Sequence, residues 1–429
     1  KIITGTIAPP ALRSTKLHGT IARESHGELG MRLVALETLR PRFQKNLCVV
    51  ILHADNGLVG LGDAFFQSAA VESYLHEHVA PLILGLEDPS PEAVSAQLAP
   101  YVGFQGGGVE VRGNGAVDVA LWDLLGRQTG QTVARLLGGP SRDEISVYNT
   151  CAGPDYIQES SAQRSSNWGD AVGQWEDLTA FMERPGELAK DLYAEGLRGM
   201  KVWPFDHAAE ASAGTRIRPD ELAKALRVVS DIRDAVGMDM DVMVELHGLW
   251  SRRAAVEICH ALEPYRPFWV EDPIRPDAID SLQSLSNEVG VPIATGETAT
   301  GRRGFRPLMQ SGAISYATVD VQWTGGLTEA RKVANLADTF AIPIAPHDCT
   351  GPITLAACFH LSMAQPNALF QETVRSFLRT WYPRIATGLP RISDGVATLS
   401  SEPGLGLTIN EDLRDPSVAH RRVSRIDSA

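Results

Sequence analysis

Three glutamates lie at equal intervals of 26 residues along this 429-residue chain, and their spacing constrains the fold more than any other feature. Glu245, Glu271 and Glu297 each follow a short apolar run that is typical of a β-strand, and a helix-like segment separates each from the next. In a (β/α)8 barrel of about 250 residues, one strand, one helix and two loops take roughly 30 residues. The spacing therefore predicts three successive parallel strands whose C-terminal ends bring the carboxylates together.

The series of polar residues extends beyond the glutamates at similar intervals. Asp320, His347 and Glu372 each follow a further strand-like run, and Lys201 follows Gly-Met upstream. One charged residue at a strand end is usually solvated or salt-bridged, but seven polar groups at the same phase of a repeat indicate a shared site. Three convergent carboxylates repel one another unless a cation lies between them, and Mg²⁺ prefers such oxygen ligands. We therefore expect a magnesium site.

Composition argues against several classes of protein. The net charge of −13 makes nucleic acid an unexpected partner, and no apolar run approaches the roughly 18 residues of a membrane span. Five scattered cysteines without metal-type spacing, and an N-terminus without a signal-like apolar region, indicate reduced thiols in a cytoplasmic protein. Cys349, two residues after His347, is either a nucleophile or, as we favour, a small residue that fills space beside the site.

Two patterns divide the chain. Residues 31–66 contain three β-rich runs with an Asp-Asn-Gly turn at 55–57, and residues 69–138 show the apolar spacing of helices. From Ile145 onward strand and helix signals alternate, which predicts a parallel sheet. A barrel is the form of that sheet that returns every strand end to one face. We expect an α/β fold, a modified (β/α)8-type barrel with an N-terminal α+β capping domain.

The expected boundaries follow from these patterns. We place the capping domain at residues 1–139, the barrel at 140–390, and at 391–429 a C-terminal segment that packs back on the capping domain. Residues 152–186 are too long for an ordinary connection. This insertion either overhangs the site or forms an oligomer contact, and we expect a homo-oligomer.

One run of residues and the ordered polar series together resemble a known family. Residues 116–124 read Ala-Val-Asp-Val-Ala-Leu-Trp-Asp-Leu, and residues 136–139 read Leu-Leu-Gly-Gly. With the series of Lys, three acids, Asp, His and Glu, these motifs resemble the enolase superfamily, specifically the galactonate-type sugar-acid dehydratases of its mandelate racemase branch. Any single motif is weak, but the ordered series is specific and covers nearly the whole chain.

The resemblance implies that Glu245, Glu271 and Glu297 hold Mg²⁺. Removal of a proton next to a carboxylate makes a dianion, whose charge a divalent ion neutralises, and Lys201 adds electrostatic stabilisation. Glu372, if protonated among its acidic neighbours, would donate a hydrogen bond to the same oxygens. The family usually has Asp at the position of Glu245, so the extra methylene means that either the metal or the backbone must shift.

Proton transfer is assigned to two histidines. His347 is the natural base, and Asp320 accepts its other ring N–H and fixes the tautomer. Members of the family with a lysine base carry Lys-x-Lys, but here Trp203 replaces the second lysine. His247 follows Glu245 by two residues, so on a strand both would share one face and point into the site. In galactonate-type dehydratases the corresponding His protonates the departing 3-hydroxyl.

These roles predict Mg²⁺-dependent β-elimination of water from an aldonic or aldaric acid, through α-proton abstraction and an enediolate, to give a 2-keto-3-deoxy acid. The alternatives are epimerisation, racemisation or cycloisomerisation of the same substrate class, or a non-catalytic sugar-acid-binding protein. The expected partner is a small anionic sugar acid. Its identity would depend on capping-domain loops, for which the candidates are residues 18–28 (His18, Arg23 and His26) and 63–68 (Phe65 and Phe66).

Overall fold

An antiparallel sheet packed against helices forms the capping domain in the computed structural model, which describes residues 30–99, 106–170 and 172–426. Its strand order is β15-β1-β2-β3, and the strands are β1 (Leu33–Pro41), β2 (Leu47–Ala54), β3 (Val59–Phe65) and β15 (Ala419–Arg425). The helices are α1 (Ser68–Tyr74), α2 (Ala80–Ile83), α3 (Pro91–Leu98), α4 (Val109–Thr129) and α5 (Val133–Leu136). The predicted turn at 55–57 is confirmed, since it joins β2 to β3 and Gly57 has a φ of 85°.

Two glycines allow α4 to lie directly against β3. A Cβ atom at Gly60 would lie 2.0 Å from the carbonyl oxygen of Ala120, and one at Gly62 would lie 1.9 Å from that of Ala116. Any side chain at either position would therefore push the helix off the strand. This packing fixes the start of α4, with Arg112, beside the end of β3, with Phe66 just after it.

The parallel strands of the second domain close into a barrel. They are β4 (Ile145–Thr150), β5 (Gly199–Val202), β6 (Asp241–Glu245), β7 (Trp269–Glu271), β8 (Ile293–Thr295), β9 (Tyr316–Ala317) and β10 (Gln371–Thr373). Each pairs in parallel with the next from β4 to β9. Ile344 bridges β9 to Ala368, just before β10, and β10 pairs in parallel with β4. The predicted (β/α)8-type barrel is therefore confirmed, with Ile344 marking the seventh strand position.

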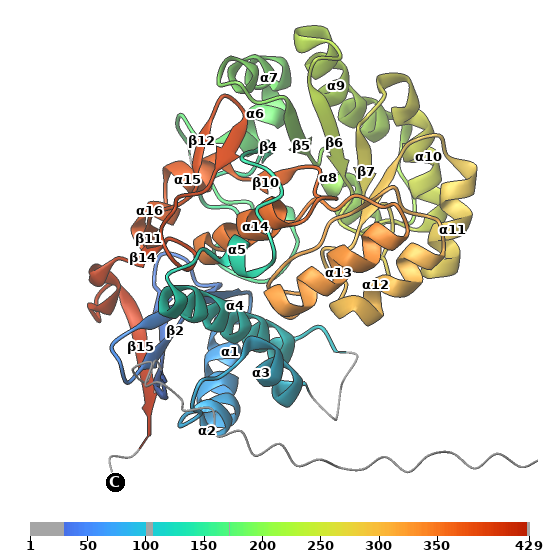
Figure 1. Ribbon diagram of the computed structural model, residues 1–429. Helices are drawn as coiled ribbons and strands as arrows, with labels where there is room; N and C mark the ends of the chain where they lie inside the picture. Colours follow the sequence, from blue (N-terminus) through green and yellow to red (C-terminus); the bar gives the residue numbers. More distant parts are fainter. Residues whose placement is uncertain (1–29, 100–105, 171, 427–429) are drawn as a thin grey trace, which may run out of the picture. The chain divides into compact units, whose positions relative to one another are not determined.

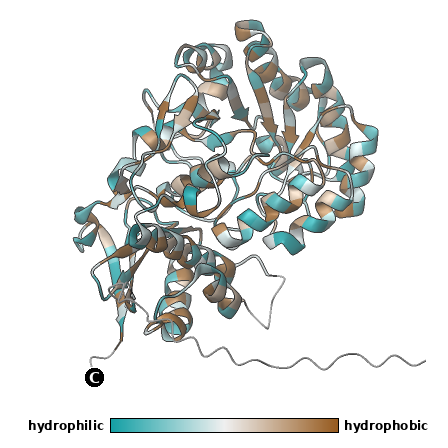
Figure 2. Ribbon diagram, viewed as in Figure 1, coloured by the Kyte–Doolittle hydropathy of each residue, from teal (hydrophilic) through white to brown (hydrophobic). Residues whose placement is uncertain are grey.

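Helices lie on the outside of the barrel strands (Figure 1). They are α6 (Asp177–Glu183), α7 (Pro185–Ala194), α8 (Asp206–Ser212), α9 (Pro219–Val236), α10 (Arg252–Leu262), α11 (Ile279–Glu288), α12 (Gly301–Gln310), α13 (Leu327–Thr339) and α14 (Pro352–Ala364). Apolar residues at helical spacing face the strands, and Figure 2 shows hydrophilic residues on the outward faces of the outer helices. The predicted start and end of α9 are confirmed: proline and acidic residues begin the helix, and Gly237 ends it.

A small aromatic cluster fills the barrel below the strand ends. Tyr148 packs edge-on against Trp269 with ring centroids 5.6 Å apart, and Met243, Ala294 and Ala345 are buried with them. The indole Nε1 of Trp269 donates a 3.0 Å hydrogen bond to Oε2 of Glu271. The apolar floor of the barrel therefore positions one of the three glutamates directly.

The C-terminal segment divides between the two domains, which corrects part of the expectation for residues 391–429. β12 (Arg391–Ser393) and β13 (Val396–Thr398) form a hairpin whose second strand pairs antiparallel with β4 of the barrel. Only later residues reach the capping domain, where β15 pairs antiparallel with β1. Between them lie β14 (Thr408–Ile409), paired with β11 (Ala386–Thr387), and the short helices α15 (Arg375–Arg379) and α16 (Tyr382–Ile385) end the barrel. The boundaries at 139 and 390 remain predictions.

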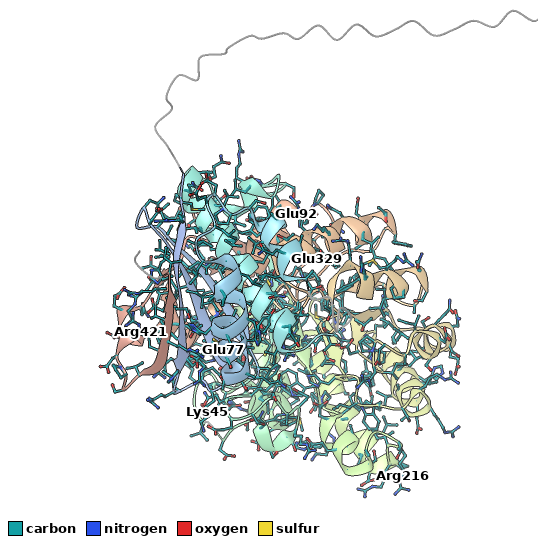
Figure 3. All side chains as sticks on the ribbon, turned by 90° about the horizontal axis from the view of Figure 1, so that it is seen from below. Lys45, Glu77, Glu92, Arg216, Glu329 and Arg421 are labelled. Atoms are coloured by element: carbon teal, nitrogen blue, oxygen red, sulfur yellow. The ribbon has the colours of Figure 1, made fainter. Side chains whose placement is uncertain are left out.

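Buried hydrogen bonds join the capping domain to the barrel. The side chain of Gln322 accepts a 2.7 Å bond from the Phe65 amide and donates a 2.9 Å bond to the Asp63 carbonyl. Lys332 pairs with Glu92 of α3 and lies 3.5 Å from Glu329 of α13, and Figure 3 shows these two glutamates close together.

Within the described residues, no helix combines the length and apolar character that a bilayer crossing requires.

Candidate active site

The three glutamates converge as their spacing predicted. Glu245 and Glu271 end neighbouring strands in paired register, and one oxygen from each of the three glutamates lies within 4.8 Å of the others. Glu297 lies beyond the end of β8, not on it, because Gly296 turns the chain with a φ of 133°. A Cβ at Gly296 would lie 2.5 Å from the Phe305 ring, so only glycine allows this turn.

Buried oxygens without partners show what this cluster lacks. Oε2 of Glu245 and Oε1 of Glu271 accept no hydrogen bond from the described residues, and the only cation that the ion pairs place near the first of these oxygens is Nζ of Lys201 at 3.6 Å. Burying such oxygens without hydrogen bonds is costly. Burial raises the pKa of Glu271, and Glu245 and Glu372 raise it further against the opposing effect of Lys201. Burial also raises the pKa of Glu297. Three hard oxygen donors that repel one another fit a divalent ion such as Mg²⁺.

The longer side chain of Glu245 is accommodated by a bond to its own loop. Oε1 accepts a 2.6 Å hydrogen bond from the backbone N–H of His247, which leaves Oε2 for the cluster. The carboxylate of Glu245 is therefore held against the loop that follows β6.

Lys201 is the cation of the cluster among the described residues. Its Nζ lies 3.1 Å from Glu271, 2.9 Å from Glu372 and 3.6 Å from Glu245, and its side chain is buried. Burial lowers the pKa of Lys201, but the carboxylates, Glu271 first, outweigh it and hold the pKa well above its usual value. The ammonium therefore stays charged where negative charge on a substrate carboxylate would develop.

The surroundings of Glu372 favour its ionised form over the protonated form that the sequence analysis considered. Burial raises its pKa, but Lys201, then His347 and the hydroxyl of Thr150, outweigh burial and lower it. Its oxygens already accept hydrogen bonds from Thr150 and from the Asp348 amide, the latter at 3.0 Å. Glu372 is therefore a carboxylate that holds Lys201, and it has no proton to donate to substrate.

His347 and Asp320 form the predicted pair. The imidazole Nδ1 lies 2.8 Å from Oδ2 of Asp320, and the other oxygen of Asp320 accepts a 2.7 Å bond from the amide of Trp323. A backbone bridge aligns the two residues on adjacent strand positions. Nε2 of His347 faces the glutamate cluster, 3.2 Å from Glu297. Burial lowers the pKa of His347, but Glu297, Glu372 and Asp320 raise it well above its usual value.

His247 lies at the site, but not for the reason expected from the sequence. β6 ends at Glu245, and His247 has a left-handed φ of 52°, so strand alternation does not direct its side chain. An ion pair does, because Nδ1 lies 2.8 Å from Oδ2 of Asp206, the first residue of α8. Nε2 lies 3.2 Å from the side-chain nitrogen of Gln163. Burial lowers the pKa of His247, but Asp206 and then Glu245 raise it to about 9.

A cavity of about 290 Å³ between the barrel mouth and the capping domain is lined by Lys201, Glu245, His247, Glu297, His347 and Glu372. Besides the residues above, its walls include Tyr156, Ile157, Ser161 and Gln163 of the 152–186 insertion, Phe66, Gln67 and Arg112 of the capping domain, and Trp203, Trp323 and Cys349. The insertion therefore overhangs the site, which is one of the two alternatives expected from the sequence. Its two tryptophans do not line the cavity: Trp168 packs on His207, and Trp175 lies against Arg375.

The remaining sequence candidates are placed as follows. Phe66 lines the cavity, whereas Phe65 is buried and does not. Residues 18–28, with His18, Arg23 and His26, lie outside the described residues. Burial raises the pKa of the Cys349 thiol well above its usual value, which disfavours a nucleophile and agrees with a space-filling role.

Two charged side chains at the candidate site were missed by the sequence analysis. Asp206 pairs with His247 across 41 positions of the chain, and Arg112 lies in the first turns of a capping-domain helix. Acids at the start of a helix are common, so no local signal distinguished Asp206. Arg112 precedes the quoted 116–124 motif and stood out only once its neighbours were known.

Two protein-family models match separate parts of the chain. The N-terminal domain of mandelate racemase and muconate lactonizing enzyme matches residues 34–138, and the enolase C-terminal domain-like family matches residues 185–413. The chain belongs to the enolase superfamily, in its mandelate racemase branch. The capping domain and barrel seen above are the two domains of that superfamily.

Individual relatives are named mostly for one reaction type. A D-galactonate dehydratase family member, RspA, from Pantoea ananatis is 30% identical over 83% of this chain and 86% of its own length. A D-galactonate dehydratase from Klebsiella pneumoniae is 28% identical over 89% of this chain and 93% of its own. A crystal structure of a mandelate racemase subgroup enolase from Agrobacterium tumefaciens superposes with a TM-score of 0.82, at 40% identity, covering 93% of this chain and 100% of that one.

Proposed function

We propose that this protein is a Mg²⁺-dependent dehydratase that converts an aldonic or aldaric acid to a 2-keto-3-deoxy acid. The observation that carries the proposal is the placement of two histidine–aspartate pairs around one acidic cluster. His247 follows β6, the third strand position, and His347 follows the seventh. Positions four apart in a closed ring of eight lie on opposite sides, so the two imidazoles approach a bound substrate from different faces.

Glu245, Glu271 and Glu297 would hold the ion. When bound, Mg²⁺ would neutralise the charge that develops on the substrate carboxylate as the α-proton leaves. Lys201 adds a fixed positive charge beside the same carboxylate, and Glu372 fixes the position of Lys201 through their 2.9 Å ion pair.

The two histidines would divide the proton transfers. His347, oriented by the carboxylate of Asp320, would remove the α-proton to give an enediolate. Glu297 is the first of the groups that raise the pKa of His347, and a bound Mg²⁺ would neutralise that charge and free the imidazole to act as a base. His247, whose ion pair with Asp206 favours the protonated form, donates a proton to the 3-hydroxyl as it leaves as water. The enol product then tautomerises to the keto acid. An acid on the face opposite the base suits an elimination, whereas racemisation needs a second base there.

The direct test is turnover of a panel of sugar acids in deuterated water with Mg²⁺. A dehydratase forms a 2-keto acid that loses no carbon, and chelation of the metal abolishes its formation. An epimerase, the second candidate, exchanges the α-proton and yields a second sugar acid without keto acid. A sugar-acid-binding protein does neither. If no member of the panel gives a keto acid and the α-proton exchanges instead, epimerisation would replace dehydration as the proposed reaction.

The assignment of His247 has its own test. His247→Asn should block dehydration and still allow His347 to exchange the α-proton of recovered substrate with solvent deuterium. General acid catalysis contributes typically about 10²–10⁴-fold. A substrate with fluoride at C3, which leaves without protonation, should recover much of the lost rate in the variant. A fluoro substrate that is no faster than the natural one in His247→Asn would show that another group is the acid.

A further inference from the structure

Arg112 is a cation at the cavity wall that has no carboxylate partner among the described residues. Its guanidinium lies 5.5 Å from the ring centroid of Phe66 and 5.3 Å from that of Trp323. The Nε atom is buried and makes no hydrogen bond with any of the described residues. Stacking on aromatic rings occupies the faces of a guanidinium and leaves its N–H groups, which lie at the edge, without acceptors. A buried donor without an acceptor is rare in folded proteins and needs an explanation.

The nearest acidic groups are engaged elsewhere. Asp320 interacts electrostatically with Arg112, but its two oxygens already bind the His347 ring and the Trp323 amide. Trp323 also lines the cavity, and its indole Nε1 has no hydrogen-bond partner among the described residues. This wall of the cavity therefore presents donors without acceptors. An anionic, oxygen-rich group is the chemistry that would satisfy them.

The backbone beside Arg112 is held in an unusual conformation. Phe66 and Gln67 both line the cavity and have left-handed φ values of 72° and 55°. Such values are uncommon for residues other than glycine and cluster at ligand-binding sites. The hydrogen bond from the Phe65 amide to Gln322 helps to hold this turn against the barrel. The turn places the Phe66 ring against Arg112, so the capping domain fixes the guanidinium at the cavity.

We propose that Arg112 binds the second carboxylate of an aldaric acid, so that the substrate is a sugar diacid. This inference rests on the proposed function, since the glutamate cluster and Lys201 would take the carboxylate next to the reacting carbon. Trp323 separates the two ends: its ring lies 5.2 Å from that of His347 and 5.3 Å from the Arg112 guanidinium. A six-carbon diacid has five C–C bonds of about 1.5 Å each between its two carboxyl carbons, and we place those carboxyl groups on the two sides of the Trp323 ring. A terminal CH₂OH group, as in an aldonic acid, would leave the arginine unpaired.

The test compares a six-carbon diacid with the monoacid of the same configuration, in wild type, Arg112→Gln and Arg112→Lys. Loss of a charge-assisted hydrogen bond should lower kcat/KM for the diacid about 10- to 100-fold in Arg112→Gln, mainly through KM. The monoacid should change less than about threefold. Arg112→Lys keeps the charge without the planar fork, so it should restore only part of the loss. Arg331→Gln is the matched control, because Arg331 also stacks on a tryptophan, Trp122, but does not line the cavity.

Calorimetric binding of both acids, with Mg²⁺ present, separates this inference from the proposed function. Tighter binding of the diacid that depends on Arg112, without turnover, would keep the binding site and remove the dehydratase. Keto acid formed from monoacids in preference to diacids would overturn the role of Arg112 and leave the dehydratase intact. Equal loss for both acids in Arg112→Gln would show that the arginine only supports the fold of the capping domain.

Discussion

Protonation of Glu37 should weaken the attachment of the C-terminal strand to the capping domain. Glu37 lies on β1, where it faces Val423 of β15 in register. Its carboxylate is 1% exposed and accepts a 2.6 Å hydrogen bond from Arg421 and a 3.3 Å bond from Arg414, and it lies 2.8 Å from Nε2 of His53. Figure 3 shows Arg421 on β15. Two of these partners come from the last twenty residues, so one carboxylate ties the end of the chain to the first strand.

The size of the effect follows from the pKa of Glu37. Burial raises that pKa, but the hydrogen bonds of His53, Arg421 and Arg414 outweigh it and lower the pKa from 4.5 to about 2. At 1.36 kcal/mol per pKa unit this corresponds to about 3 kcal/mol of stability. Because the arginines are 30–41% exposed, solvent screening reduces the expected value to about 1–3 kcal/mol. A lowered pKa means that this stability is present above pH 4.5 and is lost as the pH falls toward 2.

Urea unfolding of wild type and Glu37→Gln between pH 6 and pH 3 measures this contribution. The variant should be less stable by about 1–3 kcal/mol at pH 6, and the difference should shrink as the pH falls, with the urea m-value unchanged. Glu77→Gln is the control, because Glu77 also pairs with an arginine of β15, Arg422, but is exposed. Its effect should be much smaller than that of Glu37→Gln at every pH, because solvent screens an exposed pair. A Glu37 difference that is absent, or constant with pH, would refute the reasoning.

Four further variants test the site. Glu271→Gln should abolish Mg²⁺ binding measured by calorimetry and leave the protein folded, since it removes a mutually repelling charge; undiminished affinity would take Glu271 out of the ligand set. His347→Asn should lose α-proton exchange as well as turnover, and normal exchange in this variant would place the base elsewhere. Asp320→Asn should fold normally and lower kcat steeply, by as much as about 10⁴-fold by analogy with other His–Asp pairs. Asp206→Asn should slow dehydration more than α-proton exchange. It should also move the alkaline limb of the pH profile of kcat to lower pH, because loss of the Asp206 carboxylate lowers the pKa of the His247 acid. Equal loss of both activities would show that Asp206 only supports the fold near His247.

The barrel and most of its polar groups could be predicted because their signals are local and periodic. Each strand–helix unit has nearly constant length, so residues at the same phase, such as Glu245 and Glu271, must meet at one rim. The pairing of His347 with Asp320 follows from the same repeat, since consecutive units lie side by side. The start and end of α9 were likewise contained in its own residues.

The departures all involve contacts between segments with no common period. The orientation of His247 depends on a left-handed backbone and on Asp206 from another unit. The charge of Glu372 depends on Lys201, which reaches it across the barrel closure at 2.9 Å. The C-terminal residues divide because β13 pairs with Ile145 and Ser146, which precede the residues of β4 that pair with β10 and β5, whereas β15 pairs along the edge of β1 that β2 leaves free. The sequence alone determined the repeating unit and which residues share its rim, because strand and helix lengths are local properties. Only the tertiary structure decided which side chains of the site are charged, where they point, and that Arg112 has no hydrogen-bond acceptor for its Nε among the described residues. These properties depend on which distant groups lie within a few ångströms.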